Sequence, residues 1–239
     1  MKTTIMQFKK ALKIGSEILG VFVQKTAPAK TKHYRDTACT ALARAFLNRK
    51  TTFFGLKNHP QLCPGADYFF GMAGIKTEEI AKVYVKKERV FKNKNICKKF
   101  LAAIPQPPFF LKKGVIVIKP LQTRDKPAIV VLLINPGQAS RILGLLNFDQ
   151  YNPLEILPNQ PSCISLFAPL ANGKTHLNFI DYYDRDYQGK FQSKSVWPEE
   201  KMLISLKFRD FERMLGNLGK SSQGKFRPKL SPVKVDRIE

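Results

Sequence analysis

Three cysteines have positions at which a thiol could bind a ligand. Cys39 is expected in the first turn of a helix, Cys63 stands directly before a Pro-Gly turn, and Cys163 begins an apolar run. Ends of regular elements present side chains to clefts on a rigid scaffold. Three thiolates can bind zinc or an iron–sulfur cluster and leave one coordination position open. The sequence therefore predicts a thiol-lined pocket in which Cys39, Cys63 and Cys163 hold a metal or a redox cofactor.

These thiols also have a simpler interpretation. A cysteine outside a disulfide often behaves as a small buried hydrophobe, and the sequence has no CxxC pair and no zinc-finger spacing. Cys97 is expected to be a bystander whose basic neighbours lower its pKa and make it reactive. No motif fixes a reaction, so the sequence decides neither whether the protein is an enzyme nor which cofactor it binds, an iron–sulfur cluster or zinc.

A second candidate site is the turn Asn135-Pro136-Gly137-Gln138-Ala139, which separates an apolar run from a predicted helix. Such loops bind ligands in α/β folds, and backbone N–H groups at a helix start can hold an anion. The candidate cofactor-binding residues are therefore Asn135, Pro136, Gly137 and Gln138. The turn is not a P-loop, because the Gly-Lys-Ser/Thr ending is absent. The alternative is an ordinary turn whose geometry comes from its proline and glycine.

Arg185 is the remaining candidate cofactor-binding residue. It lies among aspartates and tyrosines in the segment 181–187, which is either a polar site or a loop at the end of a strand. The histidines form no spaced metal pair and no recognisable triad; they are His33, His59 and His176.

Helices and strands both appear in the pattern of apolar residues. Helical spacing predicts a helix over 5–18, and Asp36 is expected to cap a helix that ends near Asn48. The run 128–134 is apolar on both faces, as in a central strand that is covered on both sides. Other strands are expected at 53–56, 114–121, 163–167, 175–183 and 201–208, and other helices at 66–72, from 77 onward, at 138–146 and at 209–218.

This order of elements predicts an α/β or α+β fold, with a mixed sheet flanked by helices and a β-rich second half. With 239 residues, of which 44% are hydrophobic, the chain can build one large core. We expect one globular domain over residues 1–218. Residues 219–239 carry six basic and two acidic side chains and few large apolar ones, and are expected to form a disordered basic tail.

The net charge of +23 comes from 41 basic and 18 acidic residues. Such a surface attracts polyanions, so the alternative function is a non-catalytic binding module for an anionic partner, either RNA or a phosphorylated metabolite. Residues 82–99 carry eight basic side chains and one acidic one. They form either a binding surface or an ordinary solvated helix face, and the aromatic residues among them are expected in the core.

Four widely spaced cysteines do not form a secreted disulfide scaffold, and reduced thiols indicate a cytoplasmic protein. No signal-peptide pattern follows the first ten residues. The longest apolar run is too short for the roughly 18 residues of a membrane span, so the sequence predicts no membrane span. Oligomeric state is not encoded in these patterns.

Several short motifs in the same order resemble a known family, the domain-of-unknown-function family 169. The motifs are Ala38-Cys39, Ala43-Arg44, Cys63-Pro64-Gly65-Ala66, Lys119-Pro120-Leu121, Asn135-Pro136-Gly137-Gln138-Ala139, Cys163 and the segment 181–185. The resemblance covers residues 20–215 and implies a prokaryotic, globular, cytoplasmic protein without an assigned activity. The chain departs from the family near Phe179-Ile180, where members tend to have a Gly-Cys pair.

Overall fold

The computed structural model describes residues 4–29, 37–55, 64–71, 76–108, 114–151, 155–158, 162–180 and 197–225. Its helices are α1 (Ile5–Leu12), α2 (Ala38–Asn48), α3 (Pro64–Phe70), α4 (Thr77–Lys82), the π-helix η1 (Val83–Lys87), α5 (Lys94–Ala103), α6 (Pro136–Asn147), α7 (Ser162–Phe167), α8 (Pro169–Asn172) and α10 (Phe208–Asn217). Its strands are β1 (Ile18–Gln24), β2 (Thr52–Gly55), β3 (Val115–Pro120), β4 (Ile129–Ile134), β5 (Ile156–Pro158), β6 (Thr175–Asn178) and β7 (Met202–Lys207).

The described strands form one sheet in the order β2-β3-β1-β4-β7-β6-β5. All neighbouring pairs are antiparallel except β5 and β6, which are parallel. Every residue of the central strand β4 is buried. Its alternate side chains enter two different hydrophobic clusters, one on each face of the sheet. The prediction of a central strand covered on both sides is therefore confirmed.

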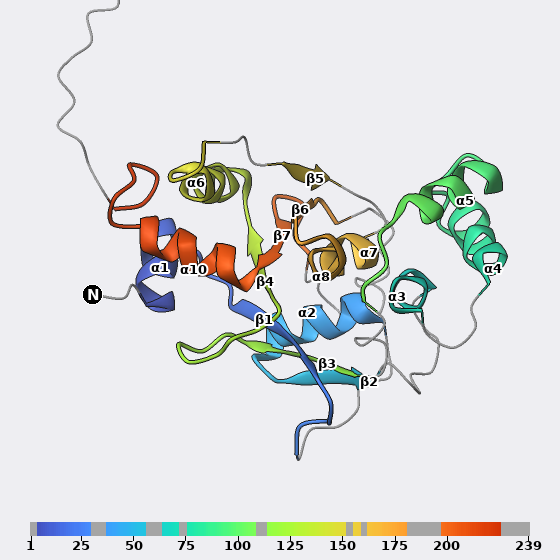
Figure 1. Ribbon diagram of the computed structural model, residues 1–239, viewed down its shortest axis with the longest axis horizontal. Helices are drawn as coiled ribbons and strands as arrows, with labels where there is room; N and C mark the ends of the chain where they lie inside the picture. The colour runs from blue at the N-terminus through green and yellow to red at the C-terminus, as the bar shows by residue number, and fades with distance from the viewer. Residues whose placement is uncertain are drawn as a thin grey trace, which may run out of the picture.

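Helices cover both faces of this sheet. The cluster on one face joins α1, α6 and α10 to the strands. The cluster on the other face contains residues of α2, α3, α4, α5, α7 and α8. Figure 1 shows α4 and α5 at one end of the molecule and α1 and α10 at the opposite end. The predicted fold class is confirmed: one α/β domain with a mixed sheet flanked by helices and a β-rich second half.

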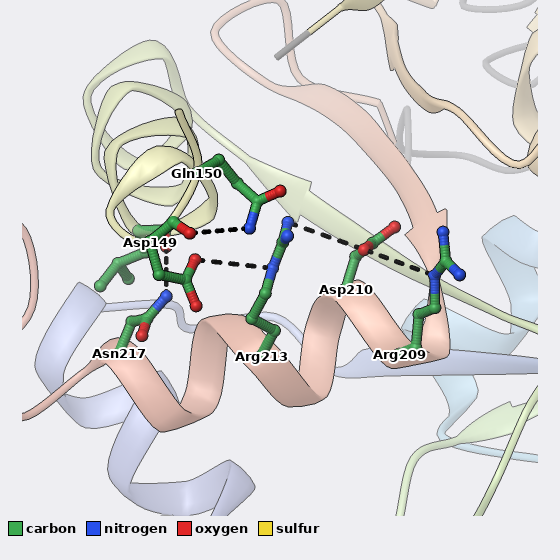
Figure 2. Close-up of polar contacts among 7 residues, drawn as sticks. Asp149, Gln150, Arg209, Asp210, Arg213 and Asn217 are labelled. Atoms are coloured by element: carbon green, nitrogen blue, oxygen red, sulfur yellow. Dashed lines mark hydrogen bonds and ion pairs between the residues drawn. The ribbon is translucent and has the colours of Figure 1, made fainter. Parts of the chain in front are cut away.

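Polar contacts fix α10 against the end of α6. Arg213 of α10 lies 3.7 Å from Asp149 and 3.6 Å from Asp210, nitrogen to carboxylate oxygen (Figure 2). Asn217, which is buried, donates its side-chain N–H to the carbonyl oxygen of Leu145 at 3.0 Å. The Arg213–Asp149 ion pair and the Asn217–Leu145 hydrogen bond link the two helices across their shared apolar surface, whereas Asp210 belongs to α10 itself.

Three expectations for individual elements are wrong. Thr37 rather than Asp36 caps α2, since its side-chain oxygen accepts from the backbone N–H of Thr40 at 3.1 Å. The run 163–167 is part of helix α7 rather than a strand, because a short apolar run suits a buried helix and a buried strand equally well. The first helix ends at Leu12, where Lys13 turns into the left-handed region with φ 56°. Ile18 then begins β1 instead of extending the helix.

Residues 219–225 follow α10 as turns that pack against α6. Arg141 donates hydrogen bonds to the carbonyl oxygens of Gln223, Gly224 and Ala11 at 2.7–2.9 Å. Residues 226–239 lie outside the described part of the chain, so the disorder of the tail stays a prediction. None of the described helices has the length and apolarity needed to cross a membrane.

Candidate functional site

The most basic described segment, residues 82–99, runs from the last residue of α4 through η1 and the following loop into the first part of α5. Seven of its eight basic side chains are exposed; these are Lys82, Lys86, Lys87, Arg89, Lys92, Lys94 and Lys99. None of the seven forms an ion pair with a described carboxylate. The eighth, Lys98, pairs with Glu78 of α4, and this contact lowers the pKa of the Glu78 carboxyl. We call residues 82–99 the basic segment.

Burial of the apolar side chains turns these cations outward. Ile80, Tyr84, Cys97 and Leu101 are each no more than 1% exposed and belong to the core cluster on this face of the sheet. Phe91 and Phe100 pack against that cluster, so the expectation that the aromatic residues belong to the core is confirmed. The side chain of Asn93 caps α5 by accepting from the backbone N–H of Ile96 at 3.0 Å.

A hollow of about 370 Å³ lies on the basic segment where α4 continues into η1. Three lysines line it together with one glutamate and one valine; the residues are Glu79, Lys82, Val83, Lys86 and Lys87. A concave surface with several like charges strengthens the local potential. The hollow therefore has the charge and size to hold a phosphate group of a larger anion.

The predicted thiol site is described only in part. Cys39 lies in the first turn of α2 and is 3% exposed, and Cys163 lies in α7 and is 7% exposed. Cys63 lies outside the described residues. Within the described ranges, no three histidine, cysteine, aspartate or glutamate side chains are grouped as metal ligands. The shared metal site of Cys39, Cys63 and Cys163 accordingly stays a prediction.

Cys163 nevertheless lies against the first turn of α3, close to Cys63 in sequence. A Cβ atom added to Gly65 would overlap both the Cys163 Sγ and the Tyr84 Oη. These two atoms are 4.0 Å apart. The Cys163 thiol of α7 and the Tyr84 phenol of η1 thus occupy the space that a side chain at position 65 would need. Gly65 follows Cys63 by two residues, so Cys163 is close to the described residues that adjoin Cys63 in sequence.

The pKa of the Cys97 thiol is shifted in the direction opposite to the one expected from the sequence. Burial raises the pKa of the Cys97 thiol, and the nearby carboxylate of Glu88 raises it further. The expected lowering by basic neighbours is wrong, because those side chains point into solvent while Cys97 is fully buried. A protonated thiol in this environment is a poor nucleophile.

The polar side chains of the 135–139 turn are engaged in capping α6. The Asn135 side chain accepts from the backbone N–H of Gln138 at 2.8 Å, and the Gln138 side chain accepts from that of Asn135 at 2.9 Å. Gln138 also donates to the carbonyl oxygens of Leu12 and Lys13 at the end of α1. Both neighbours of β4 are antiparallel to it, so the turn does not lie at a parallel switch point, where α/β sheets bind ligands.

Pro136 and Gly137 form the first turn of α6 within this capping arrangement. Arg185, the other candidate cofactor-binding residue, lies outside the described residues, as do His33 and His59. Ligand binding by these candidates remains a prediction. His176 lies in β6 and is buried.

Sequence analysis missed the π-helical turn η1. π-Helical turns are rare in proteins, and those that do occur are often found at functional sites. Here the wider turn directs Tyr84 into the core toward Cys163 and places Lys86 and Lys87 at the hollow. The only signal in the sequence was the concentration of basic residues, because π-helices have no distinct apolar periodicity.

The fold and these sites define a single-domain α/β protein with a basic helical segment and buried thiols. The chain belongs to the domain-of-unknown-function family 169, described as "uncharacterised ArCR", whose profile matches residues 7–217. The resemblance noted from short motifs is thereby confirmed. No curated protein and no solved structure matches the chain.

Proposed function

We propose that the protein is a binding module for RNA, which it contacts through the phosphate backbone at the basic segment. The observation that carries this proposal is the group of seven exposed cations, none of which forms an ion pair with a described carboxylate. Exposed cations without an ion-pair partner attract phosphates, and their binding to RNA releases the counterions condensed on the nucleic acid. The hollow lined by Lys82, Lys86 and Lys87 gathers three of these cations at one point of contact with the phosphate backbone. The net charge of +23 adds long-range attraction.

This function requires no chemical reaction. The basic side chains need only contact the RNA phosphates and neutralise their negative charge. Phosphate contacts hold the ligand without reading its sequence. Because the aromatic residues of the basic segment are packed in the core, they offer no platform for stacking bases. The proposed binding is therefore electrostatic and tolerant of RNA sequence.

The variant Lys82→Gln, Lys86→Gln, Lys87→Gln tests the proposal. We expect it to bind a fluorescein-labelled single-stranded RNA at least tenfold more weakly than the original protein, because three phosphate contacts are lost. The matched control, Lys10→Gln, Lys13→Asn, Arg124→Gln, loses the same charge at the end of α1 and in the loop between β3 and β4. Figure 1 shows α1 at the end of the molecule opposite α4 and α5. Fluorescence anisotropy at fixed salt measures both. Equal weakening by the two variants would show that only net charge matters and would refute a specific surface.

A second candidate function rests on the contact between Cys163 and the start of α3. We propose that Cys63 joins Cys163 and Cys39 as ligands of zinc or an iron–sulfur cluster in a prokaryotic, cytoplasmic protein, where thiols stay reduced. The support is that Cys163 Sγ lies beside Gly65, two residues from Cys63. Two residues of extended chain span about 7 Å, a distance that thiol side chains can bridge through an ion.

Protein purified without oxygen tests this second candidate. We expect metal analysis and the ultraviolet–visible spectrum to show a bound metal that Cys39→Ser, Cys63→Ser and Cys163→Ser each abolish. Cys97→Ser is the control and retains it, since Cys97 lies in α5, where its electrostatic neighbours are Tyr68 and Glu88 rather than another thiol. Metal-free protein, or metal that survives all three substitutions, would rule the thiol site out.

A further inference from the structure

Two adjoining hollows form a groove at the end of the molecule opposite the basic segment. One, of about 730 Å³, lies along α1, and the other, of about 620 Å³, lies along α10. They share four lining residues, Ile5, Leu121, Gln122 and Thr123, and therefore join at the loop that connects β3 and β4. We call this the α1–α10 groove. Its volume is in the range of sites for small molecules.

The floor of the groove is apolar. Phe211 and Leu121 are 1% and 8% exposed, and Ile5, Phe208 and Leu215 are partly buried against the same core cluster. The ion pair between Arg213 and Asp149 and the hydrogen bond from Asn217 to the carbonyl oxygen of Leu145 hold the α10 wall against α6 (Figure 2). An apolar body of a ligand would cover this floor and remove it from water.

The rim of the groove is cationic. Lys10, Lys13, Arg124 and Lys126 are exposed, and none forms an ion pair with a described carboxylate. Lys9 also lines the groove but pairs with Glu17 at 3.4 Å.

Two acidic residues line the groove. Asp125 is engaged by the Lys119 ammonium at 2.8 Å and by the backbone N–H of Gln122 at 2.9 Å. Glu212 is exposed. Four unpaired cations against one unengaged carboxylate leave the rim positive, so the charge complement of this groove is an anion.

We infer that the α1–α10 groove binds a small amphiphilic anion, a molecule with an apolar chain or ring and a terminal phosphate. The apolar part would lie on the floor between α1 and α10, and the phosphate would contact Lys10, Lys13 and Arg124. The hollow along α10 is the more enclosed of the two, which favours a single soluble molecule over a flat membrane surface. This site is independent of RNA binding, because it lies at the other end of the fold (Figure 1).

Three probes separate the two halves of the inference: decyl phosphate below its micelle concentration, decanol and inorganic phosphate, each titrated into the full chain by calorimetry. We expect decyl phosphate to bind at one site per chain and at least tenfold more tightly than either of the other two. A rim variant, Lys10→Gln, Lys13→Asn, Arg124→Gln, should weaken decyl phosphate at least tenfold. Asparagine is chosen at position 13 because it tolerates the left-handed backbone there.

A floor variant and a distant control complete the test. Leu215→Gln should weaken decyl phosphate at least fivefold, while Lys82→Gln, Lys86→Gln, Lys87→Gln should leave its affinity within twofold. An affinity of the rim variant within twofold of the original protein would overturn the inference, as would equal binding of inorganic phosphate. Sedimentation with anionic lipid vesicles, without binding of decyl phosphate, would assign the groove to a membrane surface and would also overturn it.

Discussion

Lowering the pH through the range between 6.5 and about 4 is expected to remove about 3 kcal/mol from the free energy of unfolding through His176 alone. Burial and, to a smaller extent, the positive charge of Lys174 together lower the pKa of His176 from 6.5 to about 4. The unfolded chain therefore takes up a proton at higher pH than the folded chain. The stabilisation is complete above 6.5 and is lost as the pH falls to about 4.

The hydrogen bonds of His176 support this direction. Asn172 accepts from the backbone N–H of Lys174 through its side-chain oxygen, so its NH₂ group faces His176 Nε2 at 2.9 Å. Nε2 must then accept, and the ring proton lies on Nδ1. That atom is buried without a hydrogen-bond partner among the described residues. A second proton on Nε2 would face the donor of Asn172, which disfavours the charged ring.

Denaturant unfolding between pH 4 and 7 measures this effect. The difference in unfolding free energy between the original protein and His176→Gln should shrink as the pH falls, because only the original protein loses the contribution of His176. The carboxylates contribute equally to both proteins and cancel in the difference. The imidazole proton resonances give a second measurement if the variant does not fold. A midpoint near 6.5 for His176 would contradict the assignment of a buried neutral ring.

Gly65→Ala is expected to destabilise the protein by about 1–3 kcal/mol through overpacking. The new methyl group would overlap Tyr84 Oη and Cys163 Sγ, and both side chains are buried. The cost should fall by about 1 kcal/mol or more in the background Tyr84→Phe, Cys163→Ala, which removes both atoms. Such non-additivity is the signature of direct contact.

Gly216→Ala is the matched control for this experiment. Its added Cβ would meet nothing within 4 Å, and the residue lies in α10. It should therefore stabilise the protein by about 0.5–1 kcal/mol, as expected for alanine in a helix. Urea unfolding measures every variant. An additive cost for Gly65→Ala in the double-substituted background would contradict the placement of Cys163 beside α3.

The sequence predicted the fold class well because its strongest signals are local. The doubly apolar run at 128–134 could only be a buried element. The helix expected from residue 138 begins two residues earlier, at Pro136, because Asn135 and Gln138 form a capping box that was not recognised in the sequence. The run 163–167 failed because it is too short to show a period. The antiparallel neighbours of β4 could not be foreseen, since strand pairing depends on contacts far apart in sequence.

The candidate sites were harder to predict than the elements. Residue type and a position in a turn suggested ligand binding by Asn135 and Gln138, but their polar atoms bond to each other and to the end of α1. The α1–α10 groove joins residues from three separate segments, and no local pattern marks such a surface. The basic segment was visible because its charges are consecutive, although the sequence does not show which of them are paired.

The salt dependence of RNA affinity tests the proposed function most directly. For single strands, the logarithm of the binding constant falls with that of the salt concentration with a slope of about 0.7 per neutralised phosphate. We predict that Lys82→Gln, Lys86→Gln, Lys87→Gln reduces this slope by about 2, while Lys10→Gln, Lys13→Asn, Arg124→Gln leaves it unchanged. Identical slopes for the two variants, or no binding of RNA by the original protein at low salt, would contradict binding at the basic segment.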